Sequence, residues 1–148
     1  MRVRCAGCVL MDGGIALMHR KNVKKQEGTT KPYGEYWVFP GGGLEETDSS
    51  KEEGAAREVK EEFGIDIKVE NILIERHIDD LDEYLFKCSY VGGTFGTGTG
   101  PEFSGDPKYA DRGEYIPEIV PLNKIKDIRL IPEEFKEKLV ELIDKNVI

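Results

Sequence analysis

The sequence has 148 residues, of which 39% are hydrophobic and 34% are charged, and its formal net charge is −8 at pH 7. This length suits one domain with its own core, so we take residues 1–148 as a single domain. The acidic balance argues against a nucleic-acid polymer or an anionic membrane as partner, because both carry dense negative charge. Arg2 and Arg4 interrupt the first segment, and no apolar run approaches the roughly 18 residues of a membrane helix, so we expect neither a signal peptide nor a membrane span.

The three cysteines are Cys5, Cys8 and Cys88, and the first two have the spacing of a CxxC motif. Both lie in an apolar strand pattern, where residues three apart point to opposite faces of a sheet. We therefore expect reduced thiols in a cytoplasmic protein, and not a zinc or redox pair.

Two predicted strands, at residues 2–11 and 15–21, open the chain and are joined by the hairpin signal Asp12-Gly13-Gly14. His19 and Arg20 end the second strand; we favour a surface role for them over substrate contact. The polar loop at residues 22–34 follows. Its default interpretation is a solvated loop, and the alternative is electrostatic help in bringing in a polyphosphate. The lysines behind that alternative are Lys21, Lys24, Lys25 and Lys31.

A predicted strand at residues 36–39 leads through a triple-glycine turn and an acidic loop into a helix. Ser49 and Ser50 are both good N-caps, each with a Glu three residues on. Gly64 is placed where a left-handed residue would end the helix.

Three acidic residues of this helix, Glu58, Glu61 and Glu62, fall on one stripe about 100° wide. The adjacent face can pack on a core. Like charges so close repel one another, and hard divalent cations such as Mg²⁺, which prefer oxygen ligands, would offset that repulsion. The alternative is a solvated acidic helix without metal. The core-facing residues predicted for this helix are Ala55, Ala56, Val59 and Phe63.

Beyond the helix we expect strands at residues 66–75 and 84–91, with a turn at 79–83 between them. The glycine-rich stretch at residues 92–114 is not a P-loop, because no Gly-Lys-Ser/Thr follows. It is either a surface loop or a substrate-side loop. In the second case Phe95, Phe103 and Tyr109 could stack on a base.

The last part of the chain predicts a strand at residues 115–122 and a terminal helix that begins at Pro132. Apolar residues at helical spacing mark the core face of this helix. They are Phe135, Leu139, Leu142 and Ile143.

Residues 42–65 resemble the signature of the Nudix hydrolases, G-x5-E-x7-R-E-U-x-E-E-x-G-U. The stretch from Arg57 to Ile65 matches every fixed position of its second half, and Pro40-Gly41-Gly42 with Glu45 matches the usual lead-in. The first half departs from the pattern. One register places Ser49 at the expected Glu, whereas the preferred register places Asp48 there with one inserted residue.

The resemblance implies an α/β (α+β) fold, namely an α/β/α sandwich around a mixed β-sheet. It also implies metal-dependent hydrolysis of a nucleoside diphosphate linked to another group, with Mg²⁺ or Mn²⁺ as cofactor. The implied metal ligands are Glu58, Glu61, Glu62 and the carbonyl of Gly42 or Gly43. The implied catalytic residues are Glu58, Arg57 and Glu61, and the substrate-binding candidates are Gly41, Gly43, Phe39 and Phe103.

Several alternatives stay open at this stage. The general base is either Glu58 or a later carboxylate, with Glu102, Glu114 and Glu118 as candidates. Substrates include nucleoside triphosphates and oxidised nucleotides, and a homodimer is an open possibility. The rival functions are a catalytically inactive Nudix-fold nucleotide-binding or sensor protein, and an acidic interaction module without metal.

Overall fold

The structure, a computed structural model, describes residues 2–105 and 112–148. Its strands are β1 (Arg2–Met11), β2 (Gly14–Val23), β3 (Gly34–Val38), β4 (Gly41–Gly43), β5 (Ile65–Ile78), β6 (Leu81–Gly93), β7 (Glu114–Pro121) and β8 (Leu130–Ile131). Its helices are α1 (Lys51–Phe63), α2 (Glu133–Asp144) and the short 3₁₀ turns η1 (Pro101–Phe103) and η3 (Leu122–Asp127).

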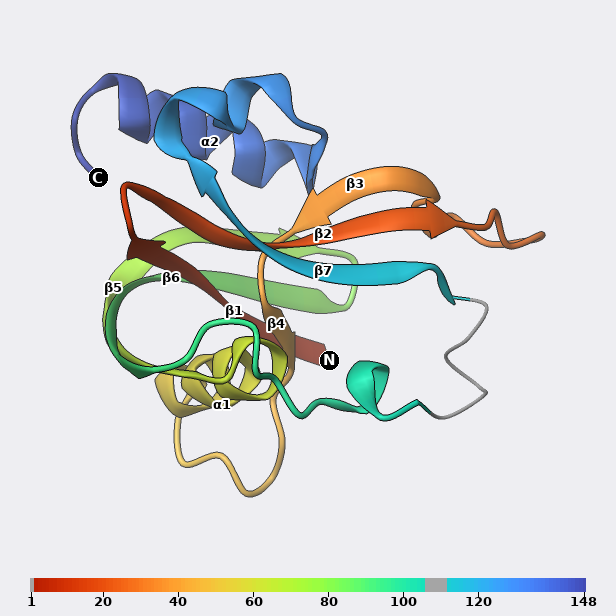
Figure 1. Ribbon diagram of the computed structural model, residues 1–148, viewed down its shortest axis with the longest axis horizontal. Coiled ribbons are helices and arrows are strands. Elements are labelled where there is room, and N and C mark those ends of the chain that lie inside the picture. The colour runs from red at the N-terminus through yellow and green to blue at the C-terminus, as the bar shows by residue number, and fades with distance from the viewer. Residues whose placement is uncertain (1, 106–111) are drawn as a thin grey trace.

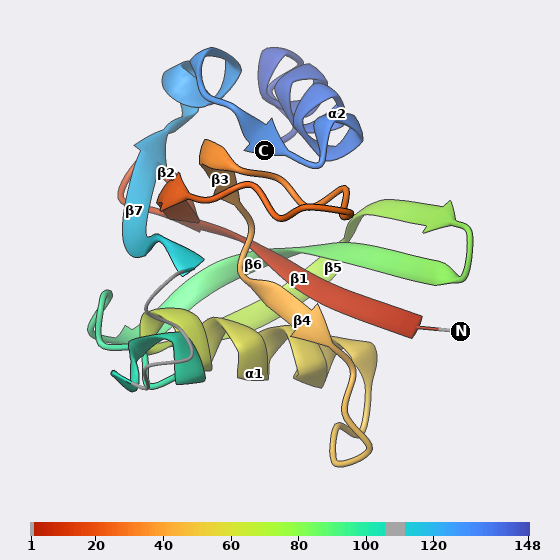
Figure 2. The same ribbon diagram turned by 90° about the vertical axis from the view of Figure 1, so that its right-hand side faces the viewer.

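The strands form one mixed sheet with helices on both faces, as Figure 1 and Figure 2 show. Its main order is β5-β6-β1-β2-β3-β8, with β4 added to β1 and β7 added to β2. β1 and β2 pair only next to their hairpin, at Leu10–Ile15 and Met11–Gly14. Beyond it β1 pairs with β6 and β4, whereas β2 pairs with β3 and β7. The sheet therefore has two halves that diverge from the hairpin.

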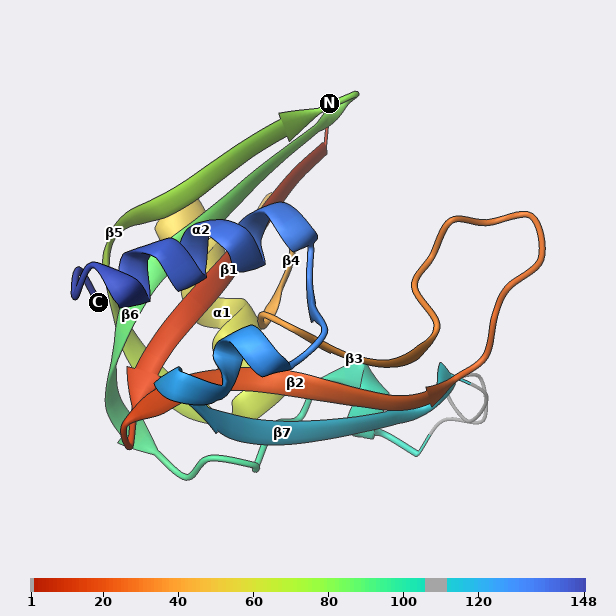
Figure 3. The same ribbon diagram turned by 90° about the horizontal axis from the view of Figure 1, so that it is seen from above.

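The core consists of two clusters, one on each face of the sheet. On β2, Leu17 packs with Phe135 and Leu139 of α2, whereas the next residue, Met18, packs with Val59 and Phe63 of α1. This alternation follows from the period of two in a strand. In Figure 3, α2 lies across the sheet and the segment between β2 and β3 extends away from the body.

The predicted α/β/α sandwich with a mixed sheet is confirmed, and every predicted strand and helix is present. Three boundaries were wrong. The turn expected at 79–83 is confined to 79–80, because Leu81–Glu83 already belong to β6. The triple-glycine segment, predicted as a turn, forms the short strand β4, and β6 continues to Gly93, inside the stretch predicted as a loop.

The cysteines agree with the interpretation from strand alternation. Cys5 belongs to the cluster beside α1 and Cys8 to the cluster beside α2, so the CxxC pair points to opposite faces. All three thiols are free and buried. Burial raises the pKa of Cys88 to about 12, which keeps that thiol protonated and unreactive.

In the part of the chain that the structure describes, no helix has the length and apolarity to cross a membrane.

Candidate active site

Helix α1 is fixed at both ends by its own sequence. Ser50 is the N-cap, and its hydroxyl accepts a hydrogen bond of 3.1 Å from the backbone N–H of Glu53. Ser49, the other N-cap candidate, instead donates its hydroxyl to the carboxylate of Glu53. Gly64 ends the helix in the left-handed conformation, with φ of 76°. The buried residues of α1 are Gly54, Ala55, Val59 and Phe63, so Gly54 takes the buried place expected for Ala56.

Strand β4 brings the backbone directly against the carboxylates of α1. A Cβ on Gly42 would overlap the carboxylate of Glu58, so a side chain there would displace that carboxylate. A Cβ on Gly41 would lie 2.7 Å from the Cβ of Ala6 on the neighbouring β1. The N–H of Gly41 donates a hydrogen bond of 2.8 Å to Oε2 of Glu62. The glycines are therefore needed for close approach, and they link the turn to two of the three predicted ligands.

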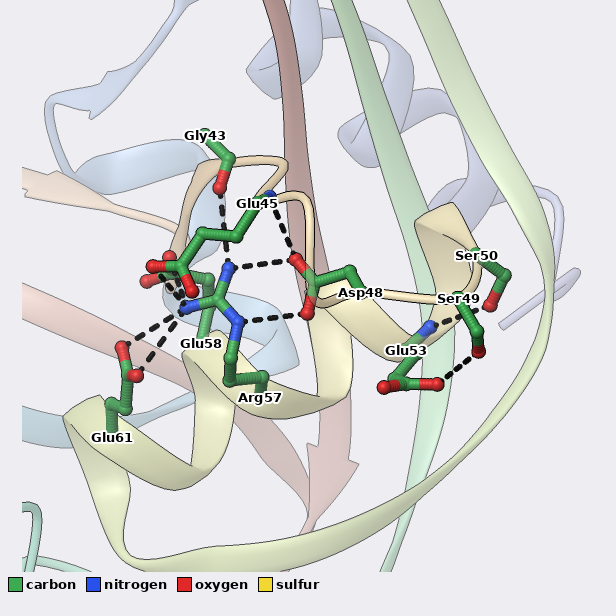
Figure 4. Close-up of polar contacts among 9 residues, drawn as sticks. All are labelled: Gly43, Glu45, Asp48, Ser49, Ser50, Glu53, Arg57, Glu58 and Glu61. Carbon is green, nitrogen blue, oxygen red and sulfur yellow. Dashed lines mark hydrogen bonds and ion pairs between the residues drawn. The ribbon is translucent and has the colours of Figure 1, made fainter.

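Arg57 is the centre of the polar network in Figure 4. Its Nε and Nη2 donate to the two carboxylate oxygens of Asp48 at 2.9 and 3.0 Å, which is a bidentate arrangement. Its Nη1 donates to Glu58 at 3.0 Å and to Glu61 at 3.3 Å. Nη2 also donates to the carbonyl of Gly43 at 3.2 Å. One guanidinium thus joins the acidic loop, the glycine turn and the helix.

This network favours the preferred signature register. The side chain of Asp48 is only 2% exposed and is paired with Arg57, whereas the hydroxyl of Ser49 is bonded to Glu53. The hydrogen bond from Arg57, followed by the N–H of Glu45, lowers the pKa of Asp48. Asp48 therefore occupies the position of the signature's first Glu.

The helix carboxylates differ in exposure and in their electrostatics. The side chain of Glu58 is 14% exposed and that of Glu61 is 40% exposed. Burial raises the pKa of Glu58, although the hydrogen bond from Arg57 acts against it. Burial raises the pKa of Glu62 well above its usual range, and the charges of Glu58 and Glu102 raise it further. Two neighbouring carboxyls thus resist ionisation, which is the condition that a bound cation relieves.

The donor set suits a hard divalent cation, since carboxylate oxygens and backbone carbonyls are its preferred ligands. Among the described residues, however, no three Asp, Glu, His or Cys side chains already converge on one point. Nη1 of Arg57 lies within hydrogen-bond distance of both Glu58 and Glu61. Glu58 uses only its Oε1 for the bond to Arg57, so its Oε2 is left for a cation while the guanidinium stays bonded to Glu58 and Asp48.

Residues 1–138 match the family profile described as the NUDIX domain. The chain belongs to the Nudix family. The predicted resemblance is confirmed, and the match extends far beyond the signature.

Solved Nudix structures share the fold at low sequence identity. A MutT protein from a study of Aliivibrio salmonicida and Vibrio cholerae superposes with a TM-score of 0.66 at 20% identity, covering 97% of this chain and 98% of that one. An ADP-ribose pyrophosphatase from Streptococcus suis gives 0.62 at 16%, covering 98% and 91%. A MutT protein from Methanosarcina mazei gives 0.62 at 21%, covering 98% and 94%. No protein with a curated description matches the sequence. These likenesses establish the fold and leave the substrate open.

The three candidate general bases, which the sequence could not rank, have different surroundings in the structure. The carboxylate of Glu118 accepts a hydrogen bond of 3.0 Å from Nε1 of Trp37 and lies 2.9 Å from Nδ1 of His19. Glu114 accepts a hydrogen bond of 2.6 Å from Nδ2 of Asn22. Glu102 lies in η1, and only its charge acts on a signature carboxylate, that of Glu62.

The loop that carries Glu102 is attached to the end of α1. The N–H of Gly100 donates to the carbonyl of Glu61 at 2.9 Å, and Gly98 lies so close to the carbonyls of Glu61 and Glu62 that a Cβ has no room. The glycines of this segment thus let it pack on the helix, which supports the substrate-side interpretation of the loop.

The predicted aromatic residues are placed differently from one another. Phe39 is buried at 3% exposure and lines a cavity. Phe103 is 36% exposed and lies edge-on to Tyr115, with 6.4 Å between ring centroids. Phe95 packs against Phe63 of the core at 5.0 Å, so it is not a free stacking face. Tyr109 lies outside the described residues.

The cavity beside Phe39 contains residues that the sequence pattern did not indicate. Its volume is about 240 Å³, and Arg4, Arg76, Glu83, Pro132 and Phe135 contribute to its lining. Arg4 and Arg76 flank Glu83 in one row across β1, β6 and β5. The interruption of an apolar strand by Arg4 was the one available signal in the sequence.

His19 was expected to have a plain surface role, and the structure contradicts this. The residue is 9% exposed, and its ring stacks on Trp37 with 4.0 Å between centroids. Its Nε2 lies 2.7 Å from Glu35. Because it joins β2 to β3 and β7, His19 has a structural role in this half of the sheet.

Proposed function

We propose that this Nudix protein is a metal-dependent hydrolase that cleaves the pyrophosphate linkage of a nucleoside diphosphate joined to another group. The observation that supports this most is the placement of the helix carboxylates against the glycine turn. Arg57 holds Glu58 and Glu61, and the N–H of Gly41 holds Glu62. Carboxylates on a solvated helix, or beside a packed core, do not need to be held against a glycine turn in this way.

In this proposal Glu58, Glu61 and Glu62, with the carbonyl of Gly42, hold Mg²⁺ or Mn²⁺. A bound ion neutralises phosphate charge and lowers the pKa of a water molecule. Arg57 has a positioning role, because its bidentate bond to Asp48 fixes the guanidinium that orients the carboxylates. Gly41 and Gly43 leave the phosphates room to approach the backbone.

Glu102 is our choice for the carboxylate that accepts the proton of the attacking water, in preference to Glu114 and Glu118. It faces Glu62 closely enough for the two charges to interact, and the anchored loop holds it at the end of α1. Glu58 is the other candidate base, but a carboxylate engaged by Arg57 and metal is less available for proton transfer.

The nucleoside is assigned to the cavity beside Phe39. Ligand sites for drug-sized molecules occupy about 300–1,000 Å³, so a cavity of this size holds a base and leaves the phosphates outside. Phe39 and Phe135 supply apolar ring contacts. Arg4 also lines this cavity, and its charge acts to lower the pKa of both Glu58 and Glu62. The substrate is therefore a small nucleotide derivative and not a nucleic-acid polymer, and the buried thiols agree with a cytoplasmic protein.

The decisive experiment is Mg²⁺-dependent phosphate release from a nucleotide panel by wild type, Glu61→Gln and Glu52→Gln. Glu61→Gln is expected to lower kcat by more than about a hundredfold with an unchanged circular dichroism spectrum, because it removes a ligand charge. Glu52→Gln is the matched control, since Glu52 is an exposed residue of the same helix, in its first turn.

The results of this panel distinguish the hydrolase from the rival functions. Equal turnover by Glu61→Gln and wild type would contradict the metal role of this residue. Nucleotide binding without turnover by wild type would identify an inactive binding or sensor protein, and the absence of both nucleotide and Mg²⁺ binding would identify an acidic interaction module. A panel of dNTPs, oxidised dGTP, dinucleoside polyphosphates and nucleotide sugars would define the substrate, and gel filtration would decide whether a homodimer forms.

A further inference from the structure

A second cavity, which we call the basic pocket, lies between the β2–β3 segment and the start of β7. Its volume is about 250 Å³, and its lining includes Arg20, Lys24, Lys31, Tyr36, Arg112 and Tyr115. Four of these are cationic, and none of the described residues that line the pocket is acidic. The net charge of the whole protein is −8, so this concentration of positive charge is a local exception.

The floor of the basic pocket is a row of three side chains across three strands. Arg20 of β2 is directly opposite Tyr36 of β3 and opposite Tyr115 of β7. Its guanidinium carbon lies 3.7 Å from the ring centroid of Tyr115 and 5.7 Å from that of Tyr36. Arg20 also donates to the carbonyls of Glu114 and Arg112 at 3.1 and 2.5 Å. These contacts fix a positive charge in place before any ligand arrives.

The two lysines at the rim complement this fixed floor. Lys24 and Lys31 are exposed, and neither forms a hydrogen bond or ion pair with another residue in the described ranges. A lysine is a mobile point charge with three donors, which suits an anion of variable geometry such as phosphate. The pocket therefore combines one ordered guanidinium with two ammonium groups that are available to a ligand.

The basic pocket adjoins the proposed active site through η1. Tyr115 of the pocket floor lies edge-on to Phe103 of η1. The residue before it, Glu102, interacts with Glu62, and Gly100 at the start of η1 is bonded to the carbonyl of Glu61. The segment at η1 therefore connects the end of α1 to the floor of the basic pocket.

We propose that the basic pocket binds a phosphate-bearing group, and that this group is the distal part of the substrate, on the other side of the scissile linkage from the nucleoside. The second part of this inference rests on the function proposed above. It narrows the substrate class to nucleotides whose second moiety is itself anionic, such as nucleoside triphosphates and dinucleoside polyphosphates. A nucleotide with an uncharged second moiety would place no negative charge against the cations of the basic pocket.

The first experiment measures binding of inorganic tripolyphosphate by calorimetry, with EDTA present so that no metal takes part. Wild type is expected to bind one equivalent, and the Lys24→Gln/Lys31→Gln double variant is expected to bind about tenfold more weakly, because charge pairs at partly exposed sites contribute modestly each. The matched control is Lys124→Gln/Lys126→Gln, which removes the same charge from exposed residues of η3. Absence of binding by wild type, or equal weakening in both double variants, would overturn the pocket as an anion site.

The second experiment separates the substrate's distal group from free phosphate as the source of the anion. For a nucleoside triphosphate, Lys24→Gln/Lys31→Gln is expected to raise KM about tenfold and to leave KM unchanged for a nucleotide sugar with an uncharged second moiety. Equal effects on both substrates, or tripolyphosphate inhibition that is not competitive, would overturn the assignment to the substrate. Lack of turnover by wild type on every nucleotide would contradict the proposed function alone, because the metal-free binding result does not depend on catalysis.

Discussion

Replacement of Asp48 by Asn tests the network around Arg57 most directly. The substitution keeps the shape of the side chain and removes its charge. In the structure both carboxylate oxygens accept from one guanidinium, and the carboxylate is 2% exposed. Hydrogen bonds to charged groups contribute about 1.5–3 kcal/mol each to stability. Arg57 keeps its contacts with Glu58 and Glu61, so we expect a loss of about 2–3 kcal/mol in total.

The assay is thermal unfolding at pH 7 without divalent ions, followed by circular dichroism. For a chain of this length 1 kcal/mol corresponds to roughly 2–4 °C, so Asp48→Asn is expected to lower Tm by about 4–12 °C. The matched control is Ser49→Ala, at the position that the other signature register would assign to the same role. Its hydroxyl contacts only an exposed carboxylate, and its loss is expected to cost less than about 0.5 kcal/mol.

Equal unfolding temperatures for the two variants would refute the reasoning, because they would show that Arg57 does not depend on Asp48. A larger loss in Ser49→Ala than in Asp48→Asn would place the signature in the other register. Activity gives a second readout, since Arg57 also contacts Glu58 and Glu61. Asp48→Asn is expected to lower kcat more than Ser49→Ala does, even at temperatures where both variants remain folded.

Four further predictions follow from the same contacts. Folding lowers the pKa of Asp48, so the stability contributed by this carboxylate is complete above its unfolded pKa of 3.8 and is lost as the pH falls below that value. The free energies of unfolding of wild type and Asp48→Asn, measured by urea titration, should therefore converge at low pH. Gly42→Ala should lower kcat/KM by about tenfold or more, since a methyl group there displaces the carboxylate of Glu58, whereas Gly92→Ala in β6 has open space and should have little effect. Mg²⁺ at 100 times its Kd should stabilise wild type by about 2.7 kcal/mol in thermal melts and should not stabilise a Glu58→Gln/Glu62→Gln variant. Glu102→Gln should lower kcat by about a hundredfold, while Glu118→Gln should leave kcat close to that of wild type.

Features determined by neighbouring residues could be predicted from the sequence. The helix from Lys51 to Phe63 is one case, because its cap, its stop at Gly64 and the spacing of its carboxylates are all local. The turn at 79–80 shows the limit of this approach. Acidic residues suggested a longer turn, but Glu83 is buried at 6% exposure between two arginines of neighbouring strands, and only the sheet register reveals that environment.

Long-range pairing explains the remaining misses. β8 has two residues, Leu130 and Ile131, and it exists because they pair in parallel with Trp37 and Val38. No pattern within residues 123–130 indicates this partner. The choice between Asp48 and Ser49 is similar, since spacing permitted both registers and the reach of the Arg57 side chain decided between them.

An acidic protein repels a polyanion, so the proposed substrate needs local positive charge, and two rows of arginines supply it. In one half of the sheet Arg4 and Arg76 flank Glu83, and in the other half Arg20 lies between Tyr36 and Tyr115. Each row holds its arginines against side chains of the same sheet, so these charges are ordered before a ligand binds. The glycine turn and its carboxylates belong to neither row. In the proposed substrate orientation the first row lines the nucleoside cavity and the second row lines the basic pocket for the distal phosphates, while the carboxylates of α1 are left for the metal.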